Sequence, residues 1–277
     1  MQNKLIIFIS IIALVLFQSD LHSKNYEDDN FNQKHLSNYL SALLSYDNDN
    51  NEKAIKFFNS SKHLLKTHDQ FLKEYVYSLV EDGQVEKAIK QIKYSRNKNS
   101  SSFFEAKLMV ILDSIKKKNF TKASKQLTQL KKFQNEGTYE YIIYKELLSF
   151  NKLFLSKKIP KDNDDFGKLS LINLVFQNCY LNSDDTNYYF KKLINNSEGD
   201  YSRYIFFYLA NILNEKKFKE AQEISANLDW LSSSLLVLQA KDWVENKKFK
   251  NFENHFSCKS ETDILGEFFF LISNLYS

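Results

Sequence analysis

The residue types that do most enzyme chemistry are sparse in this chain. His63 and His68 form the one close histidine pair, but they are five residues apart, so they do not share a helix face and make no two-histidine metal site. The glycines are isolated and form neither a phosphate-binding loop nor a dinucleotide-binding fingerprint. We therefore predict no metal ligands, no cofactor-binding residues and no nucleotide site. The glycines are Gly83, Gly137, Gly167, Gly199 and Gly266.

Paired carboxylates are the other candidates for catalysis. Asp28 with Asp29, Asp164 with Asp165 and Asp184 with Asp185 lie in polar stretches beside Asn or Ser. Acid–base catalysis needs a carboxyl group with a shifted pKa, and these surroundings predict solvation and helix capping instead. No Gly-x-Ser-x-Gly nucleophile motif is present. We expect no catalytic residue, and hence a protein that is not an enzyme.

The composition favours helices joined by polar turns. The 277 residues include 5 glycines and 1 proline, too few for many β-hairpins, while 43% are hydrophobic and 26% charged, as in globular proteins. Collagen-like, disulfide-framework and multi-pass membrane proteins are excluded. The formal net charge of +4 gives no reason to expect nucleic acid, and all basic residues except Arg96 and Arg203 are lysines.

The N-terminus has the layout of a secretory signal peptide. A short basic start, Met1 to Lys4, precedes an uncharged apolar run from Leu5 to Phe17, and Ser19 or Ser23 offers a small residue before a cleavage site. As a helix the apolar run would span about 20 Å, less than the roughly 30 Å core of a bilayer. We predict a signal peptide over residues 1–23, a disordered linker over 24–33, and export to the periplasm or cell envelope. An uncleaved membrane anchor is the alternative.

A phrase in which a hydrophobic residue lies three positions before a small one recurs along the chain. Its clearest copy runs from Asp82 to Ala88. The small residue recurs after 34 residues, from Ala54 to Ala88, and after 35, from Ala88 to Ala123. Ala221 belongs to a later copy, and Tyr188 is a possible substituted anchor.

Each copy follows an amphipathic helical stripe, so the repeating unit is two helices and a tight turn. Ser102 and Glu105 form a capping-box signature at one helix start. Gly83 stands where a helix end needs a residue that tolerates positive φ. Small residues at Ala54, Ala88, Ala123 and Ala221 would let the second helix approach the first closely.

Such pairs bury their apolar faces by stacking, which predicts an all-α fold of the α-solenoid type. The period, the Gly turn and the following Ala resemble tetratricopeptide repeats, over roughly residues 34–130 and 200–256. The family's first-helix aromatic and Leu-Gly positions are poorly kept and its proline is missing, so another α-solenoid class is the alternative. We assign repeats to 34–156 and 166–277, with an irregular loop at 157–165 between them.

The resemblance implies a partner-binding groove on the concave face, lined by the first helix of each unit. A mixed aromatic and basic groove would suit an acidic or C-terminal carboxylate segment. The groove positions carried over to this chain, with nearby charged residues, are Tyr39, Leu43, Lys73, Tyr77, Leu108, Leu112, Arg203, Phe206, Ala210 and Lys241.

We therefore expect an exported, non-enzymatic scaffold for a protein or peptide partner. One alternative is the helical accessory arm of a larger cell-envelope enzyme whose catalytic domain lies outside this chain. Another is a membrane-tethered assembly factor that keeps residues 5–17 as an anchor.

The cysteines and the C-terminal segment complete the predictions. Cys179 and Cys258 are 79 residues apart. In a regular stack, more than two units would separate them, so we expect two buried, unbonded cysteines. Glu267 to Ser277 reads as the first helix of a last, incomplete unit, which suggests a fragment of a longer repeat protein. A helix that folds back as a cap or docks on a partner is the alternative.

Overall fold

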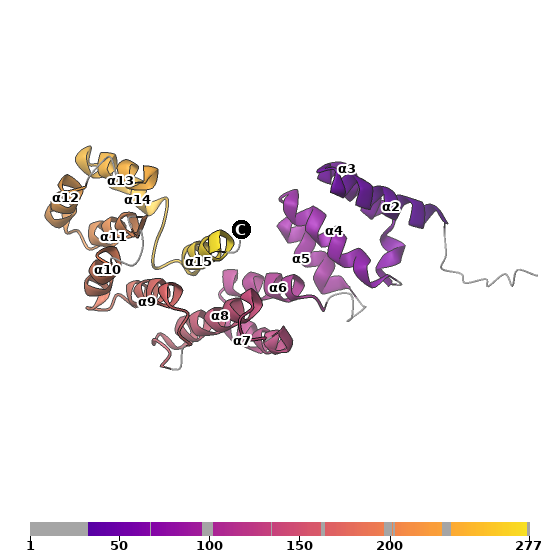
Figure 1. Ribbon diagram of the computed structural model, residues 1–277, viewed down its shortest axis with the longest axis horizontal. Helices are drawn as coiled ribbons and strands as arrows, with labels where there is room; N and C mark the ends of the chain where they lie inside the picture. The colour runs from indigo at the N-terminus through magenta and orange to yellow at the C-terminus, as the bar shows by residue number, and fades with distance from the viewer. Residues whose placement is uncertain are drawn as a thin grey trace, which may run out of the picture. The chain divides into compact units, whose positions relative to one another are not determined.

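Helices are the only regular secondary structure in the part of the chain that the computed structural model describes (Figure 1). The described residues are 33–66, 68–95, 102–133, 135–161, 164–196, 201, 203–228 and 234–275. The expected signal peptide at 1–23 and nearly all of the expected linker lie outside them. For the described residues, the all-α prediction is confirmed. None of the described helices is both long and apolar enough to cross a membrane.

Two compact units make up the chain, one ending at Gln84 and the other beginning at Val85. This division does not fall at the loop 157–165. The first unit contains α2 (Gln33–Asp47), α3 (Asn51–Ser60), a 3₁₀ helix (Lys62–Lys66) and α4 (Asp69–Glu81). Its core is aromatic, since the rings of Tyr39, Phe58, Phe71 and Tyr75 contact one another and all four side chains are buried.

The second unit continues as a series of helices in which chain neighbours pack side by side. Their mutual contacts bury a hydrophobic core that extends from Phe104 to Ile272. The helices are α5 (Val85–Tyr94), α6 (Phe104–Lys116), α7 (Phe120–Leu127), a 3₁₀ helix (Thr128–Phe133), α8 (Tyr139–Ser156), α9 (Lys168–Leu181), α10 (Thr186–Ile194), α11 (Arg203–Asn214), α12 (Phe218–Ala226), α13 (Leu235–Glu245), α14 (Lys250–Glu253) and α15 (Glu261–Leu275).

Several helices end in the same type of turn. At Gly83, φ is +76°, as the sequence predicted, and the next backbone N–H, that of Gln84, donates to the Leu79 carbonyl five residues back. Residues with a side chain take the same left-handed conformation and the same following hydrogen bond elsewhere. These residues are Asp49, Lys118, Asn182, Lys216 and Lys247, with φ of 55–59°. The repeat is therefore visible in backbone geometry as well as in sequence.

The small residues of the repeated phrase are buried. Ala54, Ala88, Ala123 and Ala221 all have 0% exposure, which fits the close packing expected of them. Tyr188 does not take this place, because its side chain is 61% exposed. The reason is a longer turn: α10 begins four residues after the left-handed Asn182, whereas α7 begins two residues after Lys118.

The start of α6 also differs from the expectation. Phe103, with φ −73° and ψ 156°, is the residue that precedes the helix, and it makes no side-chain capping hydrogen bond. Ser102 therefore lies one residue too early to cap α6, and the predicted capping box is wrong. The Ser102 carbonyl instead accepts a hydrogen bond from Lys132 Nζ.

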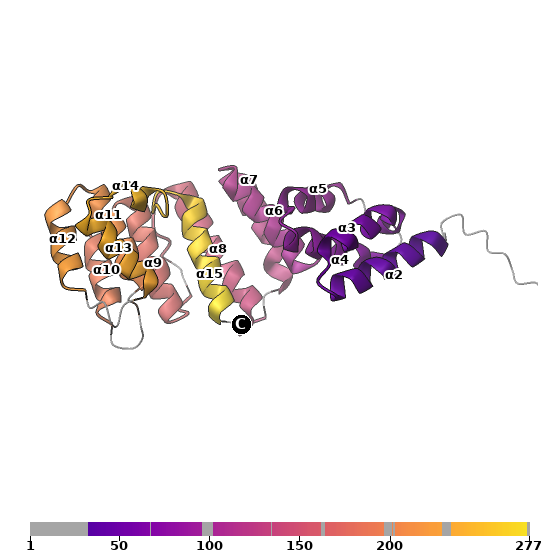
Figure 2. The same ribbon diagram turned by 90° about the horizontal axis from the view of Figure 1, so that it is seen from above.

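The last helix folds back along the second unit. α15 packs against α6 and α9, and Figure 2 shows it lying along α8. The Phe268 ring lies 6.0 Å from that of Phe150 on α8. Ile264, Phe268 and Ile272 are buried in these contacts, so much of the apolar face of this helix is covered. The alternative of a folded-back helix thus agrees with the structure.

Candidate functional site

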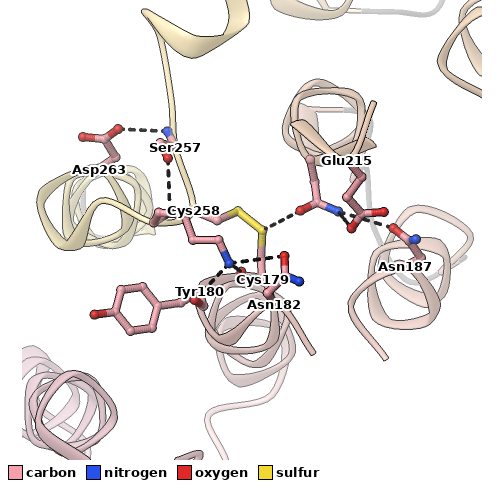
Figure 3. The surroundings of a disulfide bond; sticks show 10 residues. Cys179, Tyr180, Asn182, Asn187, Glu215, Ser257, Cys258 and Asp263 are labelled. Atoms are coloured by element: carbon pink, nitrogen blue, oxygen red, sulfur yellow. Dashed lines mark hydrogen bonds between the residues drawn. A yellow bond between two sulfur atoms is a disulfide. The ribbon is translucent and has the colours of Figure 1, made fainter. Parts of the chain in front are cut away.

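A disulfide joins α9 to the segment that precedes α15 (Figure 3). Cys179 and Cys258 are bonded, with their Cα atoms 5.6 Å apart, and both are buried. The expectation of two unbonded cysteines was wrong because it placed the repeats in an uninterrupted row. After α14 the chain instead returns to the C-terminal end of α9, which brings together two cysteines that are 79 residues apart in the sequence.

Lys259, next to Cys258, forms hydrogen bonds to the C-terminal end of α9. Its Nζ donates to the carbonyls of Cys179 at 3.0 Å and Tyr180 at 3.2 Å, and to Asn182 Oδ1 at 3.4 Å (Figure 3). These groups end α9, where free carbonyls and the helix dipole favour a cation. Burial lowers the pKa of Lys259. The disulfide and this lysine together fix the point from which α15 starts.

Glu261, the first residue of α15, adds a charged anchor. It is 7% exposed, accepts a hydrogen bond from the Tyr180 hydroxyl at 2.8 Å, and lies 3.6 Å from Lys118 Nζ in the α6–α7 turn. Burial by itself would raise the pKa of Glu261. Hydrogen bonds from its own backbone and from Tyr180, together with the charge of Lys118, outweigh burial, so the pKa lies below its ordinary value. Lys157 contacts the Tyr180 hydroxyl and stands over its ring. The start of α15 is thus tied to three other parts of the unit.

The anchored helix forms one wall of an apolar groove of about 270 Å³. Its floor and walls come from α5, α6 and α15, and most of the contributing side chains are aliphatic or aromatic. Gly266 lies in the α15 wall, and a Cβ added there would meet no atom within 4 Å. We call this the α15 groove. Its apolar lining residues are Val85, Ile89, Met109, Leu112, Ile115, Leu265 and Phe269.

Charged residues border the α15 groove. Glu86 and Lys116, both lining it, form an ion pair of 3.5 Å. Asp113 accepts hydrogen bonds from Lys93 and from Lys117, the latter at 2.7 Å. Burial raises the pKa of Asp113, but the two lysines outweigh that and hold it below its ordinary value. An apolar floor with a charged border is the arrangement of a surface that binds apolar side chains from water.

The groove residues carried over from the repeat resemblance are scattered in the structure. Tyr39 and Phe206 are 5% and 1% exposed, so both belong to the core. Lys73 and Tyr77 lie together on α4, with the ammonium 5.5 Å from the ring centre, and this pair stays a prediction.

The basic candidates have partners within the second unit. Arg203 makes a bidentate ion pair with Glu267 of α15, at 2.9 and 2.7 Å, and its guanidinium stands 4.2 Å from the Phe270 ring centre. Lys241 Nζ donates to the Leu228 carbonyl at 3.1 Å. Both residues therefore hold helices in place.

Of the carried-over positions, Leu112 alone lines the α15 groove. The α15 residues were not predicted, because the last helix was expected to form the open end of a row. A signal was present: Leu265 and Phe269 follow i, i+4 spacing beside a glycine, which indicates an apolar helix face with room next to it.

No cluster of three His, Cys, Asp or Glu side chains that could hold a metal ion occurs within the described ranges. No protein-family model, curated protein or solved structure matches this chain.

Proposed function

We propose that this protein is an exported, non-enzymatic helical-repeat scaffold that binds an apolar segment of a protein partner in the α15 groove. The observation that carries the proposal is the groove itself. Ile89, Met109 and Phe269 are only partly buried, so apolar surface remains in contact with water. Burying it against a partner contributes about 25 cal/mol per Å².

The form of the groove favours a helix as the bound segment. Three helices supply its lining, and an amphipathic helix presents apolar side chains at i, i+3 or i+4, and i+7 to such a surface. Met109 adapts its shape to different apolar side chains because its chain is unbranched. The Glu86–Lys116 pair at the border offers both signs of charge to the polar face of that helix.

The repeated turn supports a solenoid of tetratricopeptide type. Left-handed residues separated by 34 residues, from Asp49 to Gly83, and by 35, from Gly83 to Lys118, reproduce the period of that family. Paired helices and a buried small residue, such as Ala88 here, are also features of tetratricopeptide repeats. This identity rests on geometry and period alone.

Export to the periplasm or cell envelope is supported by two independent features. The first 23 residues read as a signal peptide, and the Cys179–Cys258 disulfide requires a compartment in which disulfides persist. Intact-mass measurement of the protein recovered outside the cytoplasmic membrane tests this part. A mass that lacks the leader and two hydrogen atoms is expected, and a full-length mass would contradict cleavage.

A groove-filling variant tests partner binding. Gly266→Leu adds a side chain at the groove wall, where an added Cβ meets no atom within 4 Å, and it raises helix propensity. Ala226→Leu is the matched control, because Ala226 is exposed on α12 and does not line the groove. We expect a photo-crosslinker at Met109 to capture one discrete partner in the cell envelope.

In the proposed mode, Gly266→Leu abolishes that cross-link and Ala226→Leu leaves it unchanged. Thermal unfolding of both variants checks that the fold is retained. Equal cross-linking by the wild-type protein and a stable Gly266→Leu variant would refute binding in the α15 groove.

A further inference from the structure

A line of buried polar side chains runs between α8 and α9, away from the α15 groove. Glu146 and Ser149 are three residues apart on α8, and Asn173 and Gln177 are four apart on α9, so each pair shares one helix face. All four side chains are 5% exposed or less. Gln177 Nε2 donates to Ser149 Oγ at 3.1 Å and so joins the two pairs.

A polar atom in this line lacks a partner. Gln177 Oε1 makes no hydrogen bond within the described structure. The Asn173 amide lies close enough to the Glu146 carboxyl to act on its pKa. Buried polar groups in folded proteins nearly always have a partner, and leaving one unsatisfied is costly. Apolar residues at these positions would avoid that cost, so the polar line is an unusual feature of this helix contact.

Glu146 and Ser149, the α8 members of the polar line, border a cavity of about 200 Å³, which we call the Glu146 cavity; Asn173 and Gln177 lie behind them and do not line it. The α8 residues that line it follow one face of that helix, and Asp164 and Phe166 of the α8–α9 connection complete it. At about 30 Å³ per water molecule, it has room for about six waters or a ligand of about that many non-hydrogen atoms. The lining residues are Lys145, Glu146, Leu148, Ser149, Lys152, Asp164 and Phe166.

The charges in the Glu146 cavity are arranged in two sets. Lys145 and Asp164 neutralise each other in an ion pair of 2.9 Å. Glu146 and Lys152 lie six positions apart on α8, with Ser149 midway between them. Six residues of helix separate the two charged side chains by a rise of about 9 Å. A ligand with a positive and a negative end, a few atoms apart, complements this order.

We propose that the Glu146 cavity binds a small zwitterion of the free amino-acid type. Its ammonium group hydrogen-bonds to the Glu146 carboxylate, and its carboxylate accepts hydrogen bonds from Ser149 Oγ and Lys152 Nζ. Gln177 prepares Ser149 for this role, because the hydroxyl that accepts from Nε2 keeps its own proton for the ligand. Leu148 and Phe166 leave a small apolar surface for the side chain.

The state of Glu146 agrees with this role. Burial raises its pKa to about 7, opposed by the Asn173 amide and increased by the nearby Asp164 charge. A ligand ammonium group provides the opposite charge that a buried carboxylate otherwise lacks. This site is distinct from the α15 groove, so its test is independent of the proposed partner binding.

Calorimetric titration of the mature, disulfide-bonded chain with L-alanine and L-serine tests the proposal. We expect saturable binding of at least one of them. Propionate carries only the carboxylate and isopropylamine only the ammonium group, so each should bind at least about tenfold more weakly, which is about 1.4 kcal/mol. Glucose tests for a sugar site of similar polarity.

Two variants assign the binding to the cavity. Lys152→Met and Glu146→Gln each remove one charged contact, and charge-assisted hydrogen bonds of this kind predict at least about tenfold weaker binding of the amino acid. Lys158→Met is the matched control, because Lys158 is also exposed but lies outside the cavity. It should leave affinity within about twofold, and circular dichroism checks that all three variants fold.

The proposal is overturned by absence of binding for both amino acids, by equal binding of propionate or isopropylamine, or by preference for glucose. Equal losses in Lys152→Met and Lys158→Met would also overturn it. Unchanged affinity in folded Lys152→Met and Glu146→Gln would place the ligand elsewhere and refute the assignment.

Discussion

Glu146 should make the stability of the second unit fall between about pH 4.5 and pH 7. The carboxyl is 5% exposed, and burial raises its pKa to about 7 from an ordinary value of 4.5. The folded state then holds this proton more tightly than the unfolded state, so stability is complete below pH 4.5 and is lost as the pH rises through 7. At 1.36 kcal/mol per pH unit, the full loss is about 3 kcal/mol.

Urea unfolding at a series of pH values from 5.0 to 8.5 measures this loss. Trp243 fluorescence follows the second unit, because Trp243 is buried on α13. In the ligand-free protein, Glu146→Gln keeps the shape of the side chain but cannot ionise, so its stability should vary little over this range. We expect it to exceed the wild type by up to about 3 kcal/mol at pH 8.5 and to match it at pH 5.0 within about 1 kcal/mol.

Glu223→Gln is the matched control, since Glu223 is exposed on α12 and should leave the wild-type pH dependence unchanged. Other carboxyl groups with shifted pKa values, such as Asp113 and Glu261, are shifted downward and act below this range. Equal pH dependence in the wild type and Glu146→Gln would refute the interpretation that Glu146 is a buried, destabilised carboxylate at neutral pH.

Three further predictions concern the framework. Cys258→Ser should destabilise the second unit by up to about 4.5 kcal/mol, because the disulfide restricts a long loop in the unfolded chain. A loss under about 1 kcal/mol in urea unfolding would contradict a structural role for the disulfide. Ala123→Leu should cost about 1–3 kcal/mol through overpacking, whereas exposed Ala226→Leu should change stability by less than about 0.5 kcal/mol. Both Gly83 and Lys247 have positive φ, which glycine adopts more easily than a residue with a side chain. Gly83→Ala should therefore destabilise the fold by about 1 kcal/mol, and Lys247→Gly should stabilise it by a similar amount. Shifts of the same sign in the thermal unfolding of the two variants would argue against this.

Local features of the fold were readable from the sequence because they depend on near neighbours. Apolar residues recur through the stretch from Tyr139 to Leu155, which is typical of one long helix, and α8 spans Tyr139–Ser156. Gly83 indicated a left-handed turn, and the structure has one. The same turn at Lys118 could not be predicted from the residue type, since a lysine adopts positive φ only when the surrounding helices impose it.

The residues of the α15 groove and the Glu146 cavity could be predicted only in small part. Of the positions that the repeat resemblance implied, Leu112 alone lines the α15 groove. Glu146 gave no signal, because a single acidic residue in an apolar helix becomes unusual only when α9 covers it with Asn173 and Gln177.

The sequence by itself determined the helices, the recurrence of about 34 residues and the small residues that are buried, since these follow from residue types and spacings along the chain. The tertiary structure decided where the series turns back. That return joins Cys179 to Cys258, lays α15 against α6 and opens the α15 groove. The return depends on contacts between residues far apart in the chain, and no local pattern records them.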